Sequence, residues 1–313
     1  MSNPLQPQQT ALAVNKRKRF SKTKLVENLY GYFFISPMLI GVTLLTLLPI
    51  IISLFLSFTE WNFLHGFKRI EFVGLRNFER LLADDLFWKS LTNNAILMLV
   101  VPATLIISLL LAVIINKHVY FKDMFKVIYF MPYISSLVAV AMVWQVLFHP
   151  SYGPVNNVLA SLGMDSPPKW LADVHYALPS VMMIMVWVAI GYNLIIYIAG
   201  LQAIPQELYE AAEIDGAKQR QKFFSITLPM LSSTTFFLLI TGIIGTFKVF
   251  DIIQVLTKGG PANSTSVVVF QLYETAFIHL KMSYASTMAL VLFLTIFIIT
   301  IIQWFSQRKW VNY

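Results

Sequence analysis

The chain has 313 residues, of which 57% are hydrophobic and only 12% are charged, and its net charge is +8. A soluble domain of this length could not hide so much apolar surface, so we predict a membrane protein whose apolar segments face lipid or one another. The positive residues stand at the ends of apolar segments rather than in a patch interleaved with aromatics, which disfavours a nucleic-acid-binding protein. The chain contains no cysteine, which excludes disulfides, thiolate zinc sites and cysteine nucleophiles.

The first 30 residues are polar and then basic, and we expect them to form a disordered cytoplasmic tail. The apolar run that follows, residues 32–58, is 27 residues long. As a helix it would measure roughly 40 Å, which exceeds the ~30 Å hydrocarbon core of a bilayer. The hydrophobic segment of a signal peptide has only ~7–15 residues. This run is therefore expected to stay in the protein as a membrane span.

Six apolar segments are long enough to cross a membrane, so residues 31–313 are expected to form one all-α, six-span domain. The predicted spans are residues 32–58, 91–116, 124–148, 178–201, 229–255 and 285–305. Prolines fall in or at the ends of several of them, which membrane helices tolerate when neighbouring groups satisfy the freed backbone.

The distribution of Lys and Arg predicts the orientation of these spans. With the N-terminus inside, the inner segments hold 14 of these residues and the outer loops hold 8. Six spans then place both termini in the cytoplasm, together with the loop of residues 202–228.

This loop, between the fourth and fifth spans, is predicted to fold as a helical hairpin at the membrane surface. Pro205 can open a helix, since its missing N–H falls where no intrahelical partner exists. Residues 206–215 read as the helix, and Gly216 ends it because glycine enters the left-handed cap without steric cost. A second helix is expected over residues 217–227, and Pro229 marks the entry to the fifth span.

The same loop carries a family signature. Glu210-Ala211-Ala212, three residues, Gly216, nine residues and then Ile226-Thr227-Leu228-Pro229 match the pattern E-A-A-x3-G-x9-I-x-L-P without a departure. The pattern resembles the loop of permease subunits in binding-protein-dependent ABC importers, where it forms a coupling helix that docks into a cleft of a cytoplasmic ATPase. The resemblance implies that the coupling residues are Glu207, Glu210, Ala211, Ala212, Asp215 and Gly216. The alternative is a capped hairpin that only connects two spans.

Shorter stretches resemble the carbohydrate-uptake branch of this family, the permease type of maltose and glycerol-phosphate importers. They are residues 72–78 (FVGLRNF), 130–133 (FMPY), 153–156 (GPVN) and 256–261 (LTKGGP). Their order and spacing carry the resemblance, which implies a compact six-span permease without the large periplasmic insert of the maltose protein.

The resemblance implies that the chain forms the membrane pathway for a sugar or oligosaccharide in the cell (inner) membrane of a bacterium or archaeon. The implied partners are the lipid bilayer, a second permease subunit in a heterodimer, two cytoplasmic ATP-binding subunits and an extracellular or periplasmic solute-binding protein. ATP and Mg would be used by the partner ATPase. No cofactor and no nucleic acid are expected on this chain.

Polar and aromatic residues within the spans are candidates for lining a sugar pathway, which needs hydrogen-bonding groups together with flat aromatic surfaces. The candidates are Asn93, Asn94, Gln145, Trp187, Asn193, Tyr197, Lys248 and Asp251, with Tyr192 as a further aromatic surface. Lys248 and Asp251, three residues apart in the predicted fifth span, would share a helix face near its outer end. The alternatives are an interfacial ion pair for these two, and helix-joining polar groups or gap-filling aromatics for the others.

Catalytic and metal-binding constellations are missing from the sequence. The five histidines lie in loops or at span ends, and none stands at ligand spacing from a second histidine or a carboxylate. The nucleotide-binding pattern G-x4-G-K-[ST] does not occur. The chain is therefore not expected to be an enzyme, and ATP hydrolysis is expected on another polypeptide.

Two rival transport functions stay open at this point, while a membrane-embedded enzyme is disfavoured by the missing catalytic constellation. One is an ABC importer for an amino acid, a polyamine or a phosphate ester. The other is a proton-coupled secondary transporter, which would need buried carboxylates near the middle of the membrane.

Overall fold

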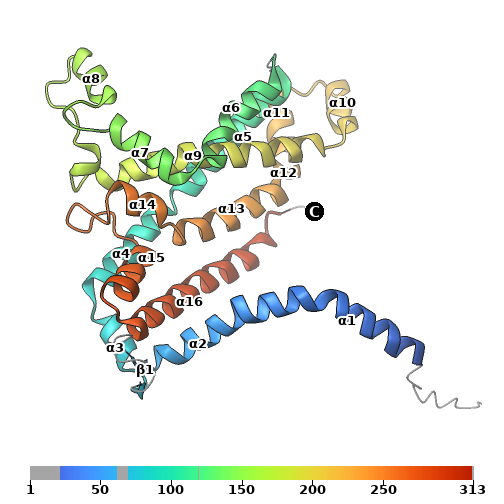
Figure 1. Ribbon diagram of the computed structural model, residues 1–313. Helices are drawn as coiled ribbons and strands as arrows, with labels where there is room; N and C mark the ends of the chain where they lie inside the picture. The colour runs from blue at the N-terminus through green and yellow to red at the C-terminus, as the bar shows by residue number, and fades with distance from the viewer. Residues whose placement is uncertain (1–21, 62–69, 119, 312–313) are drawn as a thin grey trace, which may run out of the picture. The chain divides into compact units, whose positions relative to one another are not determined.

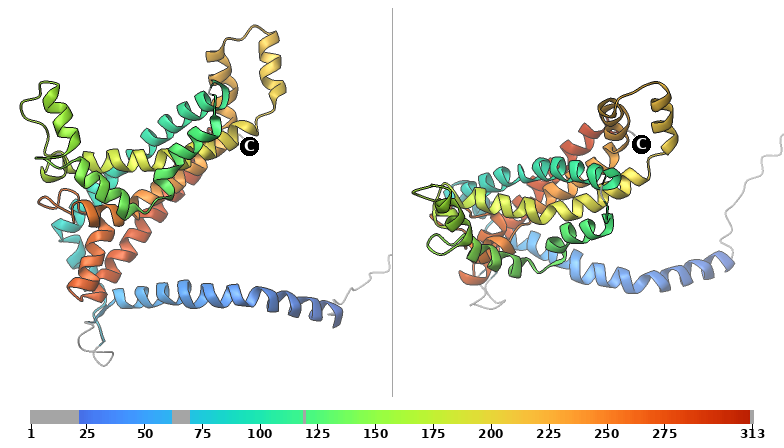
Figure 2. Two further views of the ribbon diagram at one scale, coloured as in Figure 1. Left: turned by 45° about the horizontal axis from the view of Figure 1, so that its top comes forward. Right: turned by 90° about the horizontal axis from the view of Figure 1, so that it is seen from above.

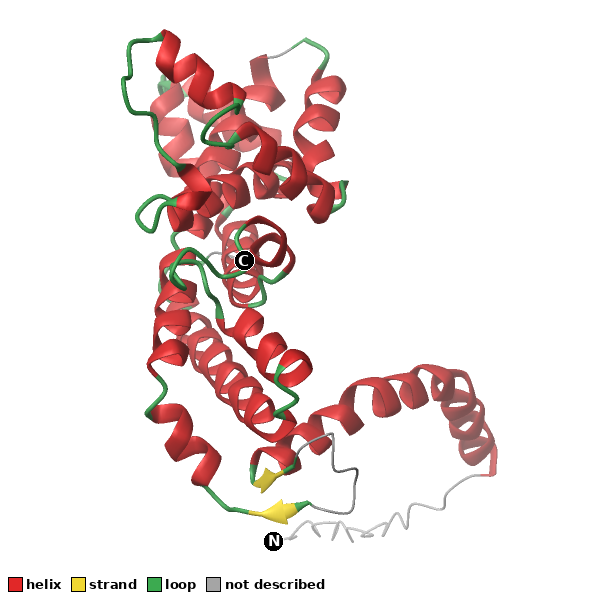
Figure 3. Ribbon diagram, turned by 60° about the vertical axis from the view of Figure 1, so that its left-hand side comes forward, coloured by secondary structure: helices red, strands yellow, loops and turns green. Residues whose placement is uncertain are grey.

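The computed structural model describes residues 22–61, 70–118 and 120–311, which are mainly α-helical with one short pair of strands (Figure 1, Figure 3). This confirms the prediction of an all-α fold. The chain divides into two units, residues 1–52 and residues 53–313.

The first unit is a helix that runs on into the second. It consists of α1 (Lys22–Val42), the π-helical turn η1 (Thr43–Leu47) and the first part of α2 (Leu48–Ser57). The apolar stretch Val26–Ser57 is 32 residues long, enough to cross a membrane. The helix begins at Lys22, so residues 22–30, expected in a disordered tail, are helical instead. This stretch contains no glycine or proline that would end a helix. Residues 1–21 of the predicted tail lie outside the described residues.

Prolines set two of the π-helical turns in the structure. η1 ends two residues before Pro49, and η4 (Phe223–Thr227) ends two residues before Pro229. Proline has no N–H, so the carbonyl four residues before it loses its usual helical partner. A π turn shifts the hydrogen bonds by one residue and lets the helix continue.

The second unit begins with two antiparallel strands and continues through helices. Its first half contains β1 (Thr59–Glu60), β2 (Glu71–Phe72), α3 (Arg76–Leu82), α4 (Asp85–Leu97), α5 (Val100–His118), α6 (Lys122–Ile134), α7 (Leu137–Leu147) and α8 (Pro154–Ser161). Its second half contains η3 (Trp170–Ala172), α9 (Ala177–Gln202), α10 (Gln206–Ile214), α11 (Gln219–Lys222), η4, α12 (Leu228–Met230), α13 (Ser232–Phe247), α14 (Asp251–Leu256), α15 (Val268–Tyr273), η5 (Glu274–Ile278) and α16 (Met282–Gln307).

The predicted spans correspond to four long apolar helices and to two bent helix pairs, which give six spans when each pair is counted as one. The four are Val26–Ser57, Asp85–Asn116, Ala177–Gln202 and Met282–Gln307. The bent pairs are Lys122–Ile134 with Leu137–Leu147, at 95°, and Gln219–Met230 with Ser232–Phe247, at 60°.

The bend between α6 and α7 has a local cause. The hydroxyl of Ser135 donates to the carbonyl oxygen of Met131 at 2.7 Å, and the backbone of Ser135 is extended, with ψ 154°. A serine hydroxyl that bonds the backbone in this way competes with helix continuation. The predicted third span therefore changes direction at this serine.

The predicted fifth span ends earlier than expected. Helix α13 stops at Phe247, and Lys248 is its C-cap, while Asp251 begins the separate helix α14. The two residues therefore do not share a helix face, and that prediction was wrong. Within the described residues no ion pair joins them. The chain turns because α14 buries its apolar side against α7 and α9, a long-range contact that overrides the local hydropathy.

Two apolar clusters form the core of the second unit. The larger cluster draws mainly on α5, α9, α13 and α16, and the smaller one on α7, the first half of α9 and α14. Helices α5 and α9 run side by side along much of their length (Figure 2). Helix α9 thus belongs to both clusters and connects the two ends of the unit.

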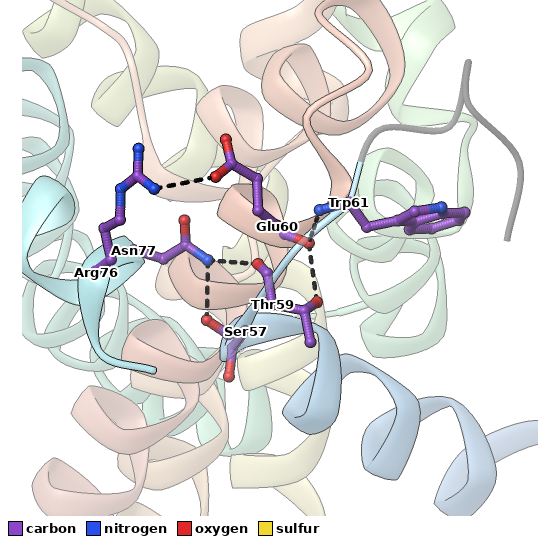
Figure 4. Close-up of polar contacts among 7 residues, drawn as sticks. Ser57, Thr59, Glu60, Trp61, Arg76 and Asn77 are labelled. Carbon is purple, nitrogen blue, oxygen red and sulfur yellow. Dashed lines mark hydrogen bonds and ion pairs between the residues drawn. The ribbon is translucent and has the colours of Figure 1, made fainter. Parts of the chain in front are cut away.

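The asparagine of the FVGLRNF stretch holds the start of the second unit together (Figure 4). The buried side chain of Asn77 donates to the carbonyl oxygens of Ser57, at 3.1 Å, and Thr59, at 2.8 Å. The Ser283 hydroxyl accepts from the N–H of Trp61 at 3.0 Å. Strand β1 is therefore fixed to α3 and to the first turn of α16.

Candidate functional site

The hairpin of α10 and α11 stands at one end of the second unit, and α8 lies at the other (Figure 2). We call these the hairpin end and the distal end. Helix α9 leads from the distal end into the hairpin, and the end of α16 lies toward the hairpin end (Figure 1). The loop after the fourth predicted span and the end of α16 therefore lie toward the same end of the unit.

Gly216 closes α10 as the sequence predicts. Its φ is +76°, the left-handed region that favours glycine. The N–H of Gly216 donates to the carbonyl of Glu213 at 3.0 Å, and the N–H of Ala217 donates to the carbonyl of Ala212 at 2.9 Å. These two bonds define a Schellman motif. The chain reverses here, and the second helix begins at Gln219 rather than at Ala217.

The predicted coupling residues lie on the surface of the hairpin. Glu207, Glu210, Ala211, Asp215 and Gly216 are exposed, and Ala212 is half-buried. Ile214, in the last turn of α10, has 88% of its surface exposed. Ile214 stands between the carboxylates of Glu213 and Asp215, so this end of the hairpin presents one exposed apolar side chain among charged and small ones.

The hairpin is joined internally by side chains that are not among the predicted coupling residues. The ammonium of Lys222 pairs with the Glu213 carboxylate at 2.6 Å, although the Lys222 side chain is only 5% exposed. The hydroxyls of Tyr209 and Thr227 are 2.9 Å apart. Sequence reasoning missed these contacts because the partners are 9 and 18 residues apart.

A cleft of about 300 Å³ opens between α5, α9 and α13, next to the end of α6. Its wall carries polar groups from three helices, Thr104, Asn193, Thr241 and Thr246, and the rings of Tyr133 and Tyr192. These two rings stack with their centroids 4.9 Å apart and their planes at 23°. Hydrogen-bonding groups beside a flat aromatic surface suit a polyhydroxylated ring.

A second cleft of about 310 Å³ adjoins the first. The two share Tyr133, Met185, Ala189 and Gly245 as lining residues, so they form one continuous depression along α9. The second part contains both Lys248 and Asp251, which are exposed. The structure thus brings three of the eight pathway candidates to this depression: Asn193, Lys248 and Asp251, together with Tyr192.

Asn93 and Asn94 lie elsewhere and join helices. Asn94 is fully buried, donates to the carbonyl of Thr246 at 3.0 Å and accepts from the N–H of Val268 at 3.0 Å. Asn93 donates to the carbonyl of Ser266 at 2.8 Å. The two amides fix α4 to the turn before α15 and to the end of α13.

The other three candidates also lie outside the clefts. Tyr197 is fully buried, and its hydroxyl donates to Thr235 at 3.2 Å. Gln145 is exposed on α7. Trp187 is 42% exposed and packs against Trp144, with the two ring centroids 5.5 Å apart. Tyr133 and the three threonines of the first cleft are residues that sequence reasoning did not select, because they come together only through packing of separate helices.

Across residues 22–61, 70–118 and 120–311, no three His, Cys, Asp or Glu side chains gather into a group that could hold a metal ion. The chemistry that the described clefts offer is therefore hydrogen bonding, aromatic stacking and the charges of Lys248 and Asp251.

Comparison with known proteins adds relatives over nearly the whole chain. The chain is 33% identical over 295 residues to the lactose transport system permease protein LacF of Rhizobium radiobacter, covering 92% of this chain and 97% of that one. It is 34% identical over 244 residues to the sn-glycerol-3-phosphate transport system permease protein UgpA of Agrobacterium fabrum, covering 77% of this chain and 83% of that one.

A solved structure shares the fold. The structure is that of a bacterial ABC transporter involved in the import of the acidic polysaccharide alginate, with a TM-score of 0.81 at 23% identity, over 93% of this chain and 99% of that one. The family model for the inner membrane component of binding-protein-dependent transport systems matches residues 104–311, which run from α5 through the hairpin and α16. The chain belongs to this family of binding-protein-dependent transport system inner membrane components.

Proposed function

We propose that this chain is the permease subunit of an ATP-driven importer and forms part of the membrane pathway for a sugar or oligosaccharide. The observation that carries the proposal is the presence of two features on one compact unit. A surface-exposed signature hairpin stands at one end, and a cleft with polar and aromatic walls lies along the helix that leads into it. The relatives named for lactose and for starch degradation products support the sugar assignment.

The cleft residues have distinct roles in this proposal. The stacked rings of Tyr133 and Tyr192 offer a surface for the apolar face of a sugar ring, and Asn193 offers an amide for its hydroxyls. Lys248 and Asp251 lie at the mouth of the pathway, toward the distal end. Asn93, Asn94 and Tyr197 have structural roles instead, because their polar groups are already bonded within the chain.

The hairpin is the site of coupling to the ATPase. Glu207, Glu210 and Asp215 present carboxylates, and Ile214 presents an apolar surface, to a cleft of the ATP-binding partner. Nucleotide and solute then bind unequally to an inward-open and an outward-open state, which is what coupling requires. ATP and Mg act on the partner, and the remaining partners are a second permease and a solute-binding protein. The alginate importer has been solved in complex with an alginate-bound periplasmic protein.

The orientation follows from this role, with the hairpin and both termini in the cytoplasm. Because the chain has no cysteine, single cysteines report cleanly on sidedness. A membrane-impermeant maleimide should label Tyr152→Cys at the distal end of intact cells. It should label Lys218→Cys in the hairpin only after the membrane is opened. The reverse pattern contradicts the proposed orientation.

The function is tested by purifying the tagged chain from its native membrane and reconstituting it in liposomes. An ATPase and a second permease should co-purify, and ATP hydrolysis should rise when the solute-binding protein and its sugar are added. A chain that purifies alone and moves solute without ATP would establish the secondary-transporter alternative and remove this one.

A phosphate ester is the second candidate substrate. A relative at 34% identity is named for sn-glycerol-3-phosphate, and the exposed ammonium of Lys248 beside the cleft suits an anionic solute. Stimulation of the ATPase by glycerol phosphate rather than by neutral sugars would favour this candidate.

A further inference from the structure

Lys222 is a charged residue in an unusually buried position. It is the last residue of α11, and only 4% of its surface is exposed. Lysine is almost never this buried unless its charge is paired. The pairing group is the carboxylate of Glu213 on α10, at 2.6 Å, whose own side chain is 64% exposed. The ion pair therefore links the two helices of the hairpin, with its cationic half inside.

A second contact links α10 to the π turn η4 that follows α11. The hydroxyl of Tyr209 on α10 lies 2.9 Å from the hydroxyl of Thr227 at the end of η4, and Thr227 is 5% exposed. Tyr209 and Glu213 are four residues apart, so they lie on one face of α10. Lys222 and Thr227 face back toward them from either end of the π turn. The two contacts together form what we call the clasp: Tyr209, Glu213, Lys222 and Thr227.

The clasp lies where the hairpin meets the ends of two spans. Lys222 and Thr227 line a groove of about 320 Å³ with Val113 and other apolar residues of α5. Tyr209 and Thr227 line a small cavity of about 40 Å³ with Val113, Asn116 and Leu201, the last from the end of α9. Tyr209 also packs on the larger core cluster. A displacement of the clasp would therefore press directly on α5 and α9.

We propose that Lys222 and Glu213 are positioning residues that make the hairpin one rigid body, so that motion of α10 against the ATPase is passed to α5, α9 and the fifth span. The inference rests on the proposed function, because it assigns a role within coupling. Without the ion pair, the link between α10 and α11 is weakened, and the hairpin can bend at the exposed turn at Gly216. Motion of the exposed helix would then be lost in bending of the hairpin.

Lys222 is buried and Glu213 is exposed, and this difference predicts how each variant of the pair will behave. Lys222→Met keeps the aliphatic packing, and the carboxylate that loses this ion partner, Glu213, lies on the exposed side of the pair, so the variant removes the link with little effect on folding. Glu213→Gln leaves a buried ammonium without its counter-charge, so it tests the same link at a larger folding cost. Lys222→Arg retains a cation in place and is the conservative variant.

A matched control exists at another ion pair. Lys126 pairs with Asp123 at 2.9 Å, three residues away within α6. Lys126→Met removes an ion pair of similar length that lies within one helix and does not join two helices. It is expected to leave coupling unchanged.

The first measurement uses the full complex in proteoliposomes and counts solute moved per ATP hydrolysed. Lys222→Met and Glu213→Gln should still assemble with the ATPase, but the ratio should fall about fivefold or more, because hydrolysis continues while motion is lost. Lys222→Arg and Lys126→Met should keep the wild-type ratio. A loss of folding alone would lower both activities and leave their ratio unchanged. A wild-type ratio in Lys222→Met overturns the proposal.

The second measurement does not depend on the partners. Spin labels on Leu208→Cys and Ser225→Cys, one on each side of the clasp, report how far α10 moves relative to η4. The distance distribution should be narrow in the otherwise unchanged chain and clearly broader in Lys222→Met. A distribution that stays narrow overturns the rigid-body role, whatever the ATPase does. If no ATPase binds any variant, the proposed function fails while this measurement still decides the clasp.

Discussion

The N–H of Ala217 donates to the carbonyl of Ala212 across a left-handed Gly216, and this 2.9 Å bond reverses the chain at the tip of the hairpin. A Cβ built on Gly216 would meet no atom within 4 Å. The glycine is therefore required for its backbone conformation and not for space.

Gly216→Val should strain this turn by about 1–2 kcal/mol, since L residues with a Cβ resist the left-handed region. We expect the permease to insert and to lose most ATP-driven uptake, measured as labelled solute in vesicles. Gly216→Asn should retain uptake, because asparagine tolerates this conformation.

The control for this prediction is Gly163→Val. Gly163 has φ +94° and open space around its Cα, but it follows α8 at the distal end. If uptake falls equally in both valine variants, a strained turn anywhere in the chain is sufficient to abolish uptake, and the turn at Gly216 has no special role.

Ile214 offers a direct test of docking. Because its side chain is 88% exposed in the chain alone, Ile214→Glu should not disturb folding, whereas burial of an unpaired carboxylate at an apolar interface is costly. The variant should reach the membrane normally, but the amount of ATPase that co-purifies with it should fall at least tenfold. Tyr120→Glu, at a tyrosine that is 90% exposed, is the matched control and should retain the ATPase. Normal ATPase recovery with Ile214→Glu would exclude Ile214 from the interface.

Asn94 should be important for stability rather than for solute. Asn94→Leu leaves the carbonyl of Thr246 and the N–H of Val268 without their partner, at a cost of roughly 2–4 kcal/mol. The thermal midpoint of the detergent-solubilised protein should fall. Thr92→Ala removes only a bond within α4, from its hydroxyl to Trp88, and should change the midpoint little. An unchanged midpoint in Asn94→Leu, with altered substrate preference, would return Asn94 to the pathway.

Asn193 is the complementary case, since its amide faces the first cleft. Asn193→Ala should lower the transport rate at saturating binding protein roughly five- to tenfold, the worth of one hydrogen bond of about 1–1.4 kcal/mol. Folding should be unaffected. Gln145→Ala, on the exposed face of α7 away from both clefts, should transport normally. A lower transport rate in Gln145→Ala, with a normal rate in Asn193→Ala, would show that the pathway lies on the other face of the unit.

Gly191 marks a close approach between α9 and α6. A Cβ at this position would meet the carbonyl oxygen of Tyr129 and lie 2.7 Å from the Cα of Phe130. Backbone cannot move aside as a side chain can, so Gly191→Ala should destabilise the unit by about 1–3 kcal/mol. Gly31→Ala, in open space on α1, should be neutral or stabilising because alanine favours helix. Equal thermal midpoints for the two variants would contradict this close packing.

The sequence alone determined the features that depend on neighbouring residues. Runs of apolar residues predicted the spans, because a membrane helix must satisfy its backbone within itself. Gly216 predicted the end of α10, because the left-handed cap is a property of that residue. The E-A-A signature predicted the family, which the match over residues 104–311 confirms.

The tertiary structure decided what each polar residue does. Asn94 and Asn193 are both amides in apolar helices, yet Asn94 bonds the backbone of α13 and of the first residue of α15, while Asn193 faces a cleft. The fifth span ended at Phe247 because α14 packs on α7 and α9, which hydropathy along the chain does not record. Lys222 can pair with Glu213 only because the turn at Gly216 reverses the chain. Helix formation depends on contacts between residues a few positions apart. The burial of a side chain, its pairing and its place in a cleft depend on which distant helices pack together. Local patterns in a single sequence contain no information about that packing.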